Sequence, residues 1–264
     1  MSEEVKQIRK RRAMTTEAAR RVKLSGHEAE KEFADLIGGQ IYPGTRKKDV
    51  IDAQNNIHSV KSGDKKWQVF LYGKKRFEDS IGFLGARLFI NCIDCFPEAR
   101  RDYLNNKTKC KLKIQPKMRT LKDLLESSNP IFLHSNKLVF LQEAVFHSSE
   151  VDYFTVKENN LFHVFDANEV IRVINDFTVV ANSKAIQGDQ MDDQKVIFIL
   201  SDKDITIGEI EMRNDSEVHY RQVKFWLDRE ITLNLLKDKI KPARKKSTRI
   251  IAYGKAINKF SLQA

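Results

Sequence analysis

Three segments in the last third of the 264-residue chain have the length of strands and are rich in β-branched and aromatic residues. They are Lys195–Leu200, Ile205–Arg213 and Val218–Leu227. Two other segments, Asp166–Phe177 and Glu230–Ile240, repeat apolar residues at helical spacing. Strands and helices interspersed along one chain predict an α/β protein. We expect a central mixed β-sheet that is flanked by helices.

The N-terminal half begins with a basic arm over residues 1–24. An amphipathic helix is expected over His27–Ile37, because acidic residues fill its first turns and Ser25 can cap it. Gly38-Gly39 ends this helix, and a short strand with a turn follows at residues 40–45.

A β-hairpin is predicted next, with strands at Val50–Ala53 and Ile57–Lys61. If its loop centres on Asn55, Asp49 lies opposite Lys61. Because side chains alternate along a strand, Ser59 and Lys61 share one face.

The middle of the chain gives weaker patterns. Two segments have helical spacing or composition, Lys65–Glu78 and Leu121–Ser127. Three others indicate strands, namely Arg87–Ile93, Ile131–Leu141 and Tyr153–Phe165.

The charge of the chain points to a polyanionic partner. Lys and Arg number 47 against 36 Asp and Glu, which gives a formal net charge of +11. The basic residues form seven clusters that contain few acids, a distribution that favours nucleic acid. The clusters are Arg9–Arg12, Arg20–Lys23, Arg46–Lys48, Lys65–Lys66, Lys74–Arg76, Lys107–Lys113 and Arg244–Lys246.

Three cysteines cannot form a closed set of disulfides, so we expect free, buried thiols in a reducing compartment. The first residues contain no apolar signal core, and no apolar stretch has the length of a membrane span. A cytoplasmic protein is expected.

The hairpin carries a recognisable motif. Asp49 precedes one strand, Ser59-Val60-Lys61 lies on the next, and the helix Gly26–Ile37 comes before both. In these residues the chain resembles the PD-(D/E)XK nuclease superfamily, and within it the type II restriction endonucleases. That family has an Asp at the start of one hairpin strand and an acid-X-Lys on the next. Here Ser59 stands where the family has Glu or Asp.

The resemblance implies a restriction-endonuclease-like fold and a Mg²⁺-dependent site that hydrolyses phosphodiesters with an activated water. Asp49 would hold the metal, and Lys61 would position the nucleophile. Because Ser59 replaces the acid of the family motif, the second carboxylate would come from Glu78 on a following helix or from Glu32 on the preceding one.

The resemblance further implies a type II restriction enzyme that cuts double-stranded DNA at a specific sequence. It would work as a homodimer beside a cognate DNA methyltransferase. Residues 25–125 would form the nuclease core, and residues 126–264 would complete the sheet and supply DNA recognition. The candidate DNA-binding residues are Arg46, Lys47, Lys48, Arg213, Asn214 and Arg221.

Alternatives stay open at this point. A second hairpin pairs Glu211 with Gln222-Val-Lys224 at a similar spacing, so it competes with Asp49 and Lys61 as the active site. Two other functions also fit the charge and the motif. They are a DNA repair or recombination nuclease and a DNA-binding protein without catalysis.

Overall fold

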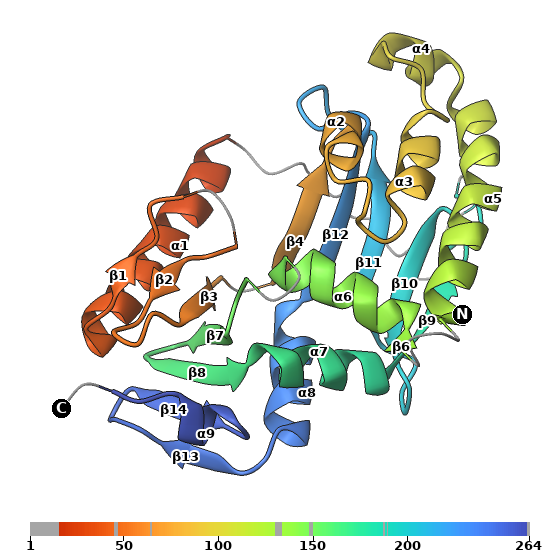
Figure 1. Ribbon diagram of the computed structural model, residues 1–264. Helices are drawn as coiled ribbons and strands as arrows, with labels where there is room; N and C mark the ends of the chain where they lie inside the picture. The colour runs from red at the N-terminus through yellow and green to blue at the C-terminus, as the bar shows by residue number, and fades with distance from the viewer. Residues whose placement is uncertain are drawn as a thin grey trace, which may run out of the picture.

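The computed structural model describes residues 16–44, 47–63, 65–129, 134–147, 150–186, 188 and 190–262, with the backbone alone for 16–23, 25, 129 and 134. Arg46 and residues 1–15 of the predicted basic arm lie outside the described residues. Two main sheets organise the described part of the chain, and Figure 1 shows them side by side. The protein is therefore mixed α/β, as expected, although it has two large sheets where one was predicted.

The first sheet has seven strands in the order β1-β2-β3-β7-β8-β14-β13. The pairs β3–β7 and β8–β14 are parallel and the others are antiparallel, so this sheet is mixed. Its strands are β1 (Gln40–Ile41), β2 (Val50–Ile51), β3 (Ile57–Lys61), β7 (Tyr153–Glu158), β8 (Leu161–Asp166), β13 (Ala243–Lys245) and β14 (Ile250–Tyr253).

The second sheet has five strands in the order β4-β12-β11-β10-β9, and all its pairs are antiparallel. The strands are β4 (Lys66–Tyr72), β9 (Thr178–Asn182), β10 (Lys195–Leu200), β11 (Thr206–Arg213) and β12 (Gln222–Asp228). A small sheet of β5 (Ser128–Asn129) and β6 (His134–Ser135) is separate. In both large sheets, strands from before and after residue 125 pair with each other.

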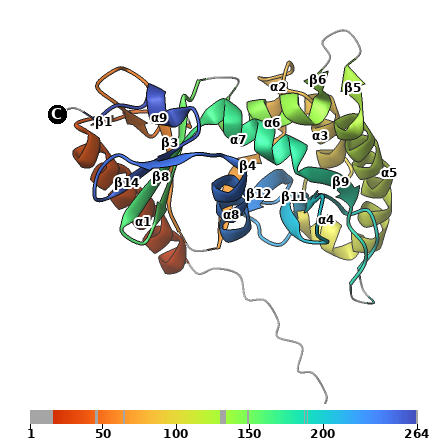
Figure 2. The same cartoon turned by 90° about the horizontal axis from the view of Figure 1, so that it is seen from below.

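Helices cover these sheets. α1 and α9 pack on one face of the seven-stranded sheet, α3, α5 and α6 pack on the five-stranded sheet, and α7 contacts strands of both (Figures 1 and 2). The helices are α1 (Thr16–Ile37), α2 (Lys74–Glu78), α3 (Ala86–Ile93), α4 (Arg100–Asn105), α5 (Lys107–Glu126), α6 (Asn136–Phe146), α7 (Ala167–Asp176), α8 (Arg229–Lys239) and α9 (Ala256–Lys259).

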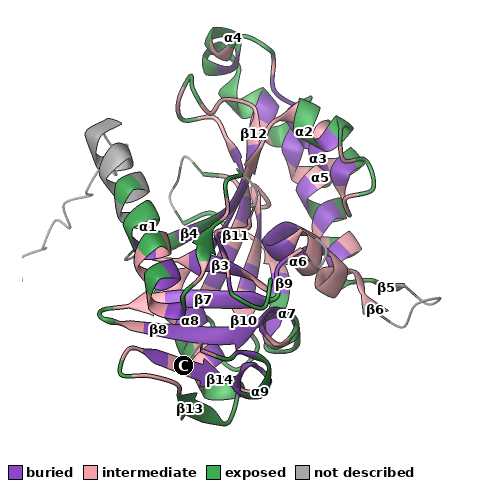
Figure 3. Cartoon of the chain, turned by 60° about the vertical axis from the view of Figure 1, so that its left-hand side comes forward, coloured by how far each residue is buried: buried purple, intermediate pink, exposed green. Residues whose placement is uncertain are grey.

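The smaller of two cores lies between α1 and the seven-stranded sheet. Phe33 of α1 packs its ring 5.0 Å from the ring of His58 in β3, and Phe260 lies 5.4 Å from the same ring. Figure 3 shows β7 and β8 buried, whereas the outer side of α1 is exposed. The helix therefore binds the sheet through one apolar stripe.

The larger core joins the two sheets. Phe70 of β4 lies at its centre, with ring centroids 5.9 Å from Phe225, 6.2 Å from Phe89 and 6.4 Å from Phe140. These four rings come from two strands and two helices and are nearly inaccessible to solvent. Burying a side chain of this size contributes roughly 1.5–3 kcal/mol, so the rings hold the helical layer against the five-stranded sheet.

Several predicted elements are confirmed. The hairpin strands form β2 and β3, Tyr153–Phe165 forms the pair β7–β8, and Asp166–Phe177 contains α7. The C-terminal patterns give β10, β11, β12 and α8, although β12 begins at Gln222, four residues later than predicted.

Three assignments in the middle of the chain are wrong. Residues 66–72 form strand β4, because pairing with β12 outweighs the helical spacing; only Lys74–Glu78 is helical. Arg87–Ile93 belongs to helix α3, whose buried Phe89 and Cys92 are three residues apart. Of the strand predicted over Ile131–Leu141, His134–Ser135 forms β6, residues 136–141 open helix α6, and residues 131–133 lie outside the described residues. Short apolar runs fit a buried strand or a buried helix equally well.

The first helix begins earlier than predicted. α1 starts at Thr16 and continues through Ser25 and Gly26, so Ser25 is an interior residue and not a cap. The helix thus includes part of the predicted basic arm.

Alanine substitutions at two glycines test this description. Gly26→Ala is expected to raise the free energy of unfolding by about 0.5–1 kcal/mol, because Gly26 is inside a helix with open space around its Cα. Gly208→Ala is expected to lower it, because a Cβ there would lie 2.7 Å from Leu227 Cδ2 and 2.9 Å from the Trp226 carbonyl. Urea unfolding measures both, and a loss of stability in Gly26→Ala would show that α1 breaks at this residue.

Candidate functional site

The β2–β3 hairpin is fixed by its own turn. The Asp52 Oδ1 atom accepts hydrogen bonds from the backbone N–H groups of Gln54 and Asn56, both at 2.9 Å. Asn55 adopts a left-handed conformation with φ of 64°, which asparagine tolerates better than most residues. This turn sets a register in which Val50 faces His58.

The register brings Asp49 beside His58 and Ser59. The pairs Ile51–Ile57 and Val50–His58 centre the loop on Gln54, and the Asp49 backbone N–H donates to the His58 carbonyl at 3.0 Å. The prediction that Asp49 lies directly opposite Lys61 is therefore wrong by two residues. A shift of two keeps the same face of the sheet, so Asp49, Ser59 and Lys61 still converge.

These three residues, here named the Asp49 cluster, are joined through one oxygen atom. Asp49 Oδ2 accepts hydrogen bonds from the Val60 backbone N–H at 2.7 Å, from Lys61 Nζ at 3.1 Å and from Ser59 Oγ at 3.3 Å. Lys61 Nζ also donates to Ser59 Oγ at 2.8 Å and to the Val60 carbonyl at 3.1 Å. The carboxylate and the ammonium group are thus held in one geometry.

Solvent reaches the cluster from one side. Ser59 is fully buried, whereas the side chains of Asp49 and Lys61 are 16% and 26% exposed. A reactant can therefore approach these two charged groups, while Ser59 lies behind them.

Lys47 supports the cluster from within the protein. Its ammonium group donates to the carbonyl of Val69 in β4 and, at 2.8 Å, to the carbonyl of Ala144 in α6. Burial, together with the nearby positive charge of Lys61, lowers the pKa of Lys47 to about 7, although Asp49 opposes the shift. Lys47 therefore connects the cluster to the five-stranded sheet and to α6. Its ammonium group points away from solvent, although Lys47 was a candidate DNA-binding residue.

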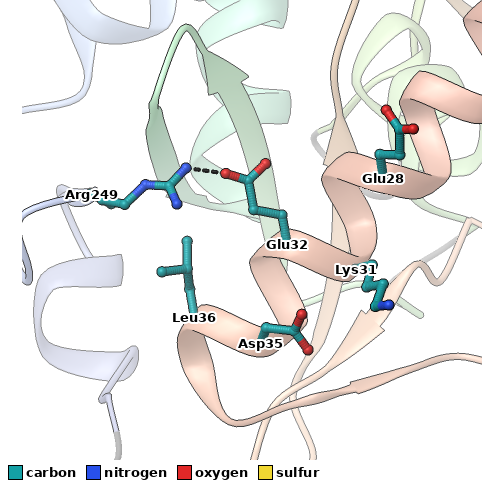
Figure 4. Close-up of a pocket in the computed structure, with 6 residues that line it drawn as sticks. All are labelled: Glu28, Lys31, Glu32, Asp35, Leu36 and Arg249. Carbon is teal, nitrogen blue, oxygen red and sulfur yellow. Dashed lines mark hydrogen bonds and ion pairs between the residues drawn. The ribbon is translucent and has the colours of Figure 1, made fainter.

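Glu32 lies apart from the Asp49 cluster. His58 and Val60 face α1, so Ser59 and Lys61, which alternate with them, face the other side of the sheet. Glu32 is on α1, where its carboxylate binds Lys157 of β7 at 2.5 Å and also Arg249 (Figure 4). Burial alone would raise the pKa of Glu32, but these two partners lower it.

The Glu32 carboxylate instead lines a shallow cavity of about 360 Å³ beside α1. Figure 4 shows Glu28 and Asp35 on the same helix, with Arg249 approaching from the other side. We therefore interpret Glu32 as part of an ion-paired contact that holds α1 to the sheet.

Glu78 is also remote. It is an exposed residue at the end of α2, which follows the end of β4 that lies away from β3 (Figure 1). Across the described ranges, no three Asp, Glu, His or Cys side chains are grouped so that they can hold a metal ion. The positions of these residues show that the structure brings Asp49 and Lys61 together but does not bring Glu78 or Glu32 to them.

One carboxylate that was not a sequence candidate lies beside a residue that binds Lys47. Glu143 of α6 precedes Ala144, whose carbonyl binds Lys47. Glu143 Oε2 accepts a hydrogen bond from the Leu84 N–H at 2.6 Å, and burial raises the pKa of Glu143. No local pattern identifies such a residue, because its environment depends on contacts between segments that are distant in sequence.

The candidate DNA-binding residues are mostly engaged within the protein. Lys48 Nζ lies 3.4 Å from the carboxylate of Glu150. The guanidinium group of Arg213 binds Asp215 through two hydrogen bonds of 2.7 and 2.8 Å.

The other two candidates contact the α3–α4 region. Arg221 lies 3.1 Å from Asp94, and the carbonyl of Asn214 accepts a hydrogen bond from Arg100 at 3.3 Å. These contacts attach the β11–β12 connection to the neighbouring helices.

The competing hairpin has a different electrostatic character. Glu211 and Lys224 are paired across β11 and β12, with Nζ 3.8 Å from the carboxylate. Lys195 of β10 lies 3.2 Å from Glu211 and 2.7 Å from Glu209. Burial alone would lower the pKa of Lys195, but the two glutamates raise it. Both carboxylates are thus neutralised by lysines on the same face of the sheet.

The expectation of buried free thiols is confirmed. Cys92, Cys95 and Cys110 are buried free thiols. His58 lies on the face opposite Ser59, where Nδ1 is 3.0 Å from the Thr155 hydroxyl, and burial lowers the pKa of His58. In the part of the chain that the structure describes, every helix is too short or too polar to cross a membrane.

Comparisons of the chain with known protein families, with curated proteins and with solved structures find no match. Functional inference therefore depends on the geometry of the Asp49 cluster.

The pKa of Lys47 predicts a pH dependence of stability. Unfolded Lys47 titrates near 10.4, so between about pH 7 and 10 the unfolded chain holds a proton that the folded chain lacks. This group's contribution to the free energy of unfolding therefore rises with pH, by roughly 1 kcal/mol per pH unit.

The variant Lys47→Met should lose this rise of stability with pH. Urea unfolding from pH 7 to 9.5 measures it, with Lys48→Met as the control. Parallel curves for wild type and Lys47→Met would contradict the assignment.

Proposed function

We propose that this protein is a divalent-metal-dependent endonuclease that cuts double-stranded DNA and has a restriction-endonuclease-like core. One observation carries the proposal: the carboxylate of Asp49, directly before β2, and the ammonium group of Lys61, at the end of β3, lie 3.1 Å apart. The order of elements supports it as well, because α1, β1 and the β2–β3 hairpin follow the order on which the resemblance depends.

The oxygen atoms of the cluster fit a magnesium ion. Mg²⁺ retains several waters and needs only one or two carboxylates in addition to substrate oxygens. Within the described residues, Asp49 Oδ1 accepts no hydrogen bond, since all three donors bind Oδ2. Asp49 and the Val60 carbonyl would hold the ion. When bound, the ion would shield the phosphate charge and make a water more acidic.

The side chains of the cluster have separate tasks. Lys61 orients the attacking water and offsets the negative charge that develops on the phosphate. Asp49 positions Lys61 and the Val60 backbone. Ser59 is neutral and buried, so it fixes the ammonium group of Lys61 without adding charge.

Because the Asp49 cluster has little net charge, metal binding would depend on the phosphate oxygens of the DNA. Asp49 is the only acidic residue of the Asp49 cluster, and Lys61 balances it. Phosphate oxygens from DNA would complete the ligand set, so metal and DNA would bind together. The net charge of +11 favours this polyanion. Sequence-specific cleavage, a homodimer and a cognate methyltransferase are the further parts of the restriction-enzyme proposal.

Cleavage of plasmid and genomic DNA with Mg²⁺ or Mn²⁺ tests the proposal. Lys61→Ala and Asp49→Asn should each lower the cleavage rate by about 10²–10⁴-fold, because they remove the ammonium group and the carboxylate. Lys224→Ala is the matched control from the competing hairpin and should cut like wild type. Loss of cleavage in Lys224→Ala, with cleavage retained in Lys61→Ala, would move the active site to that hairpin.

Glutamine substitutions then test the missing carboxylate. Glu32→Gln should lower stability and leave the cleavage rate within about threefold of wild type, because Glu32 binds Lys157 and Arg249 on the other face of the sheet. Glu78→Gln and Glu143→Gln are measured in parallel. A loss of about 10²-fold or more in one of them, without loss of stability, would identify the second acid.

A DNA-binding protein without catalysis is the second candidate. It is favoured by the ion pair between Asp49 and Lys61, which can fix the β2–β3 hairpin without catalysis, and by the net charge of +11. That candidate predicts tight, salt-sensitive DNA binding and no cleavage with either metal. A repair or recombination nuclease would instead prefer branched or damaged DNA to a defined sequence.

A further inference from the structure

The basic segment of α5 has no role in the site described above. From Lys107 to Lys122 the chain contains seven Lys or Arg residues and no Asp or Glu. One side of this helix is buried in the larger core through Cys110, Ile114 and Met118. The charges are therefore gathered on the remaining sides.

One flank of α5 is occupied by the protein itself. Arg119 forms an ion pair with Asp193 at 2.8 Å, and the Gln115 side chain donates to the Asp192 carbonyl at 2.8 Å. These contacts attach α5 to the chain just before β10.

The other flank carries Lys109, Lys113 and Lys117, here named the Lys109 stripe. These residues are four apart, so they lie on one side of the helix. Lys109 and Lys113 are exposed and Lys117 is half-buried. Among the described carboxylates, none lies within ion-pair distance of these three ammonium groups. Within the part of the chain that the structure describes, the stripe is therefore a row of positive charges without acidic partners.

The spacing of the stripe suits a regular polyanion. Four residues of helix rise about 6 Å, so the stripe is about 12 Å long. Each strand of a DNA duplex carries one phosphate per roughly 3.4 Å of axis, so about three or four phosphates of one backbone span that length. Several lysines can therefore contact one backbone at the same time.

The stripe is distant from the Asp49 cluster. Figures 1 and 2 both show α5 at the opposite end of the molecule from α1 and β1–β3. A phosphate backbone on the stripe thus leaves the Asp49 cluster accessible.

We propose that the Lys109 stripe binds the phosphate backbone of double-stranded DNA and forms a contact surface separate from the Asp49 cluster. A membrane surface is the poorer partner, because a membrane-bound helix inserts an apolar face and the apolar face of α5 is buried in the core (Figure 3). Contacts to phosphates carry no sequence information, so this surface adds affinity and not specificity.

Salt-dependent binding tests this surface. The full chain is titrated against a fluorescein-labelled duplex in EDTA, between about 50 and 200 mM NaCl, so the measurement does not depend on cleavage. The variant Lys109→Gln/Lys113→Gln/Lys117→Gln should bind about tenfold more weakly or worse. The slope of log K against log salt concentration should be smaller in magnitude by about 2–3, because each phosphate contact contributes about 0.9 to that slope.

A matched control separates the stripe from net charge. Lys203→Gln/Lys241→Gln/Lys255→Gln removes the same charge from exposed lysines near α8 and α9, and should keep the wild-type slope. Thermal unfolding verifies that both variants fold. Equal slopes for the two variants would overturn the proposal. Unchanged DNA affinity with lost binding to phosphatidylserine vesicles would overturn it too and assign the stripe to membranes.

Discussion

The parallel pairing of β3 with β7 is the constraint on which the site depends. It sets Ser59 beside Phe154 and Lys61 beside Val156, so β3 is an interior strand with β2 on its other side. The connection between these parallel strands runs over residues 62–152 and includes β4 and α6. Those two elements supply the carbonyls that bind Lys47. The same pairing therefore fixes the orientation of Lys61. It also places β4 and α6 beside the cluster, where their carbonyls bind Lys47.

An available carboxylate oxygen distinguishes the Asp49 cluster from the competing hairpin. Asp49 has one oxygen that binds three donors and a second that is available among the described residues. Around Glu209 and Glu211, by contrast, lysines neutralise both carboxylates on the face of a continuous antiparallel sheet. A site for a cation and a phosphate needs an available oxygen beside a fixed positive charge, which the Asp49 cluster has.

Local features could be predicted from the sequence, and features that depend on distant contacts could not. The turn residues after Asp52 predict the hairpin, and a spacing of twelve residues is short enough to bring Asp49 and Lys61 together. The strand β4 was missed because its pairing partner, β12, lies about 150 residues further along the chain. Glu32 is separate from the site because α1 packs on the face of the sheet opposite Ser59 and Lys61. The apolar periodicity of α1 predicts a buried stripe but does not predict which face of the sheet the helix covers.

The central claim is that Asp49 and Lys61 converge at the position where a cation and a phosphate bind. Anomalous diffraction from crystals of the Lys61→Ala variant, grown with Mn²⁺ and uncleaved duplex DNA, measures this directly. We expect a manganese peak bound by Asp49 and the Val60 carbonyl, with a backbone phosphate beside it. A peak beside Glu211, with Asp49 left without metal, would contradict the account.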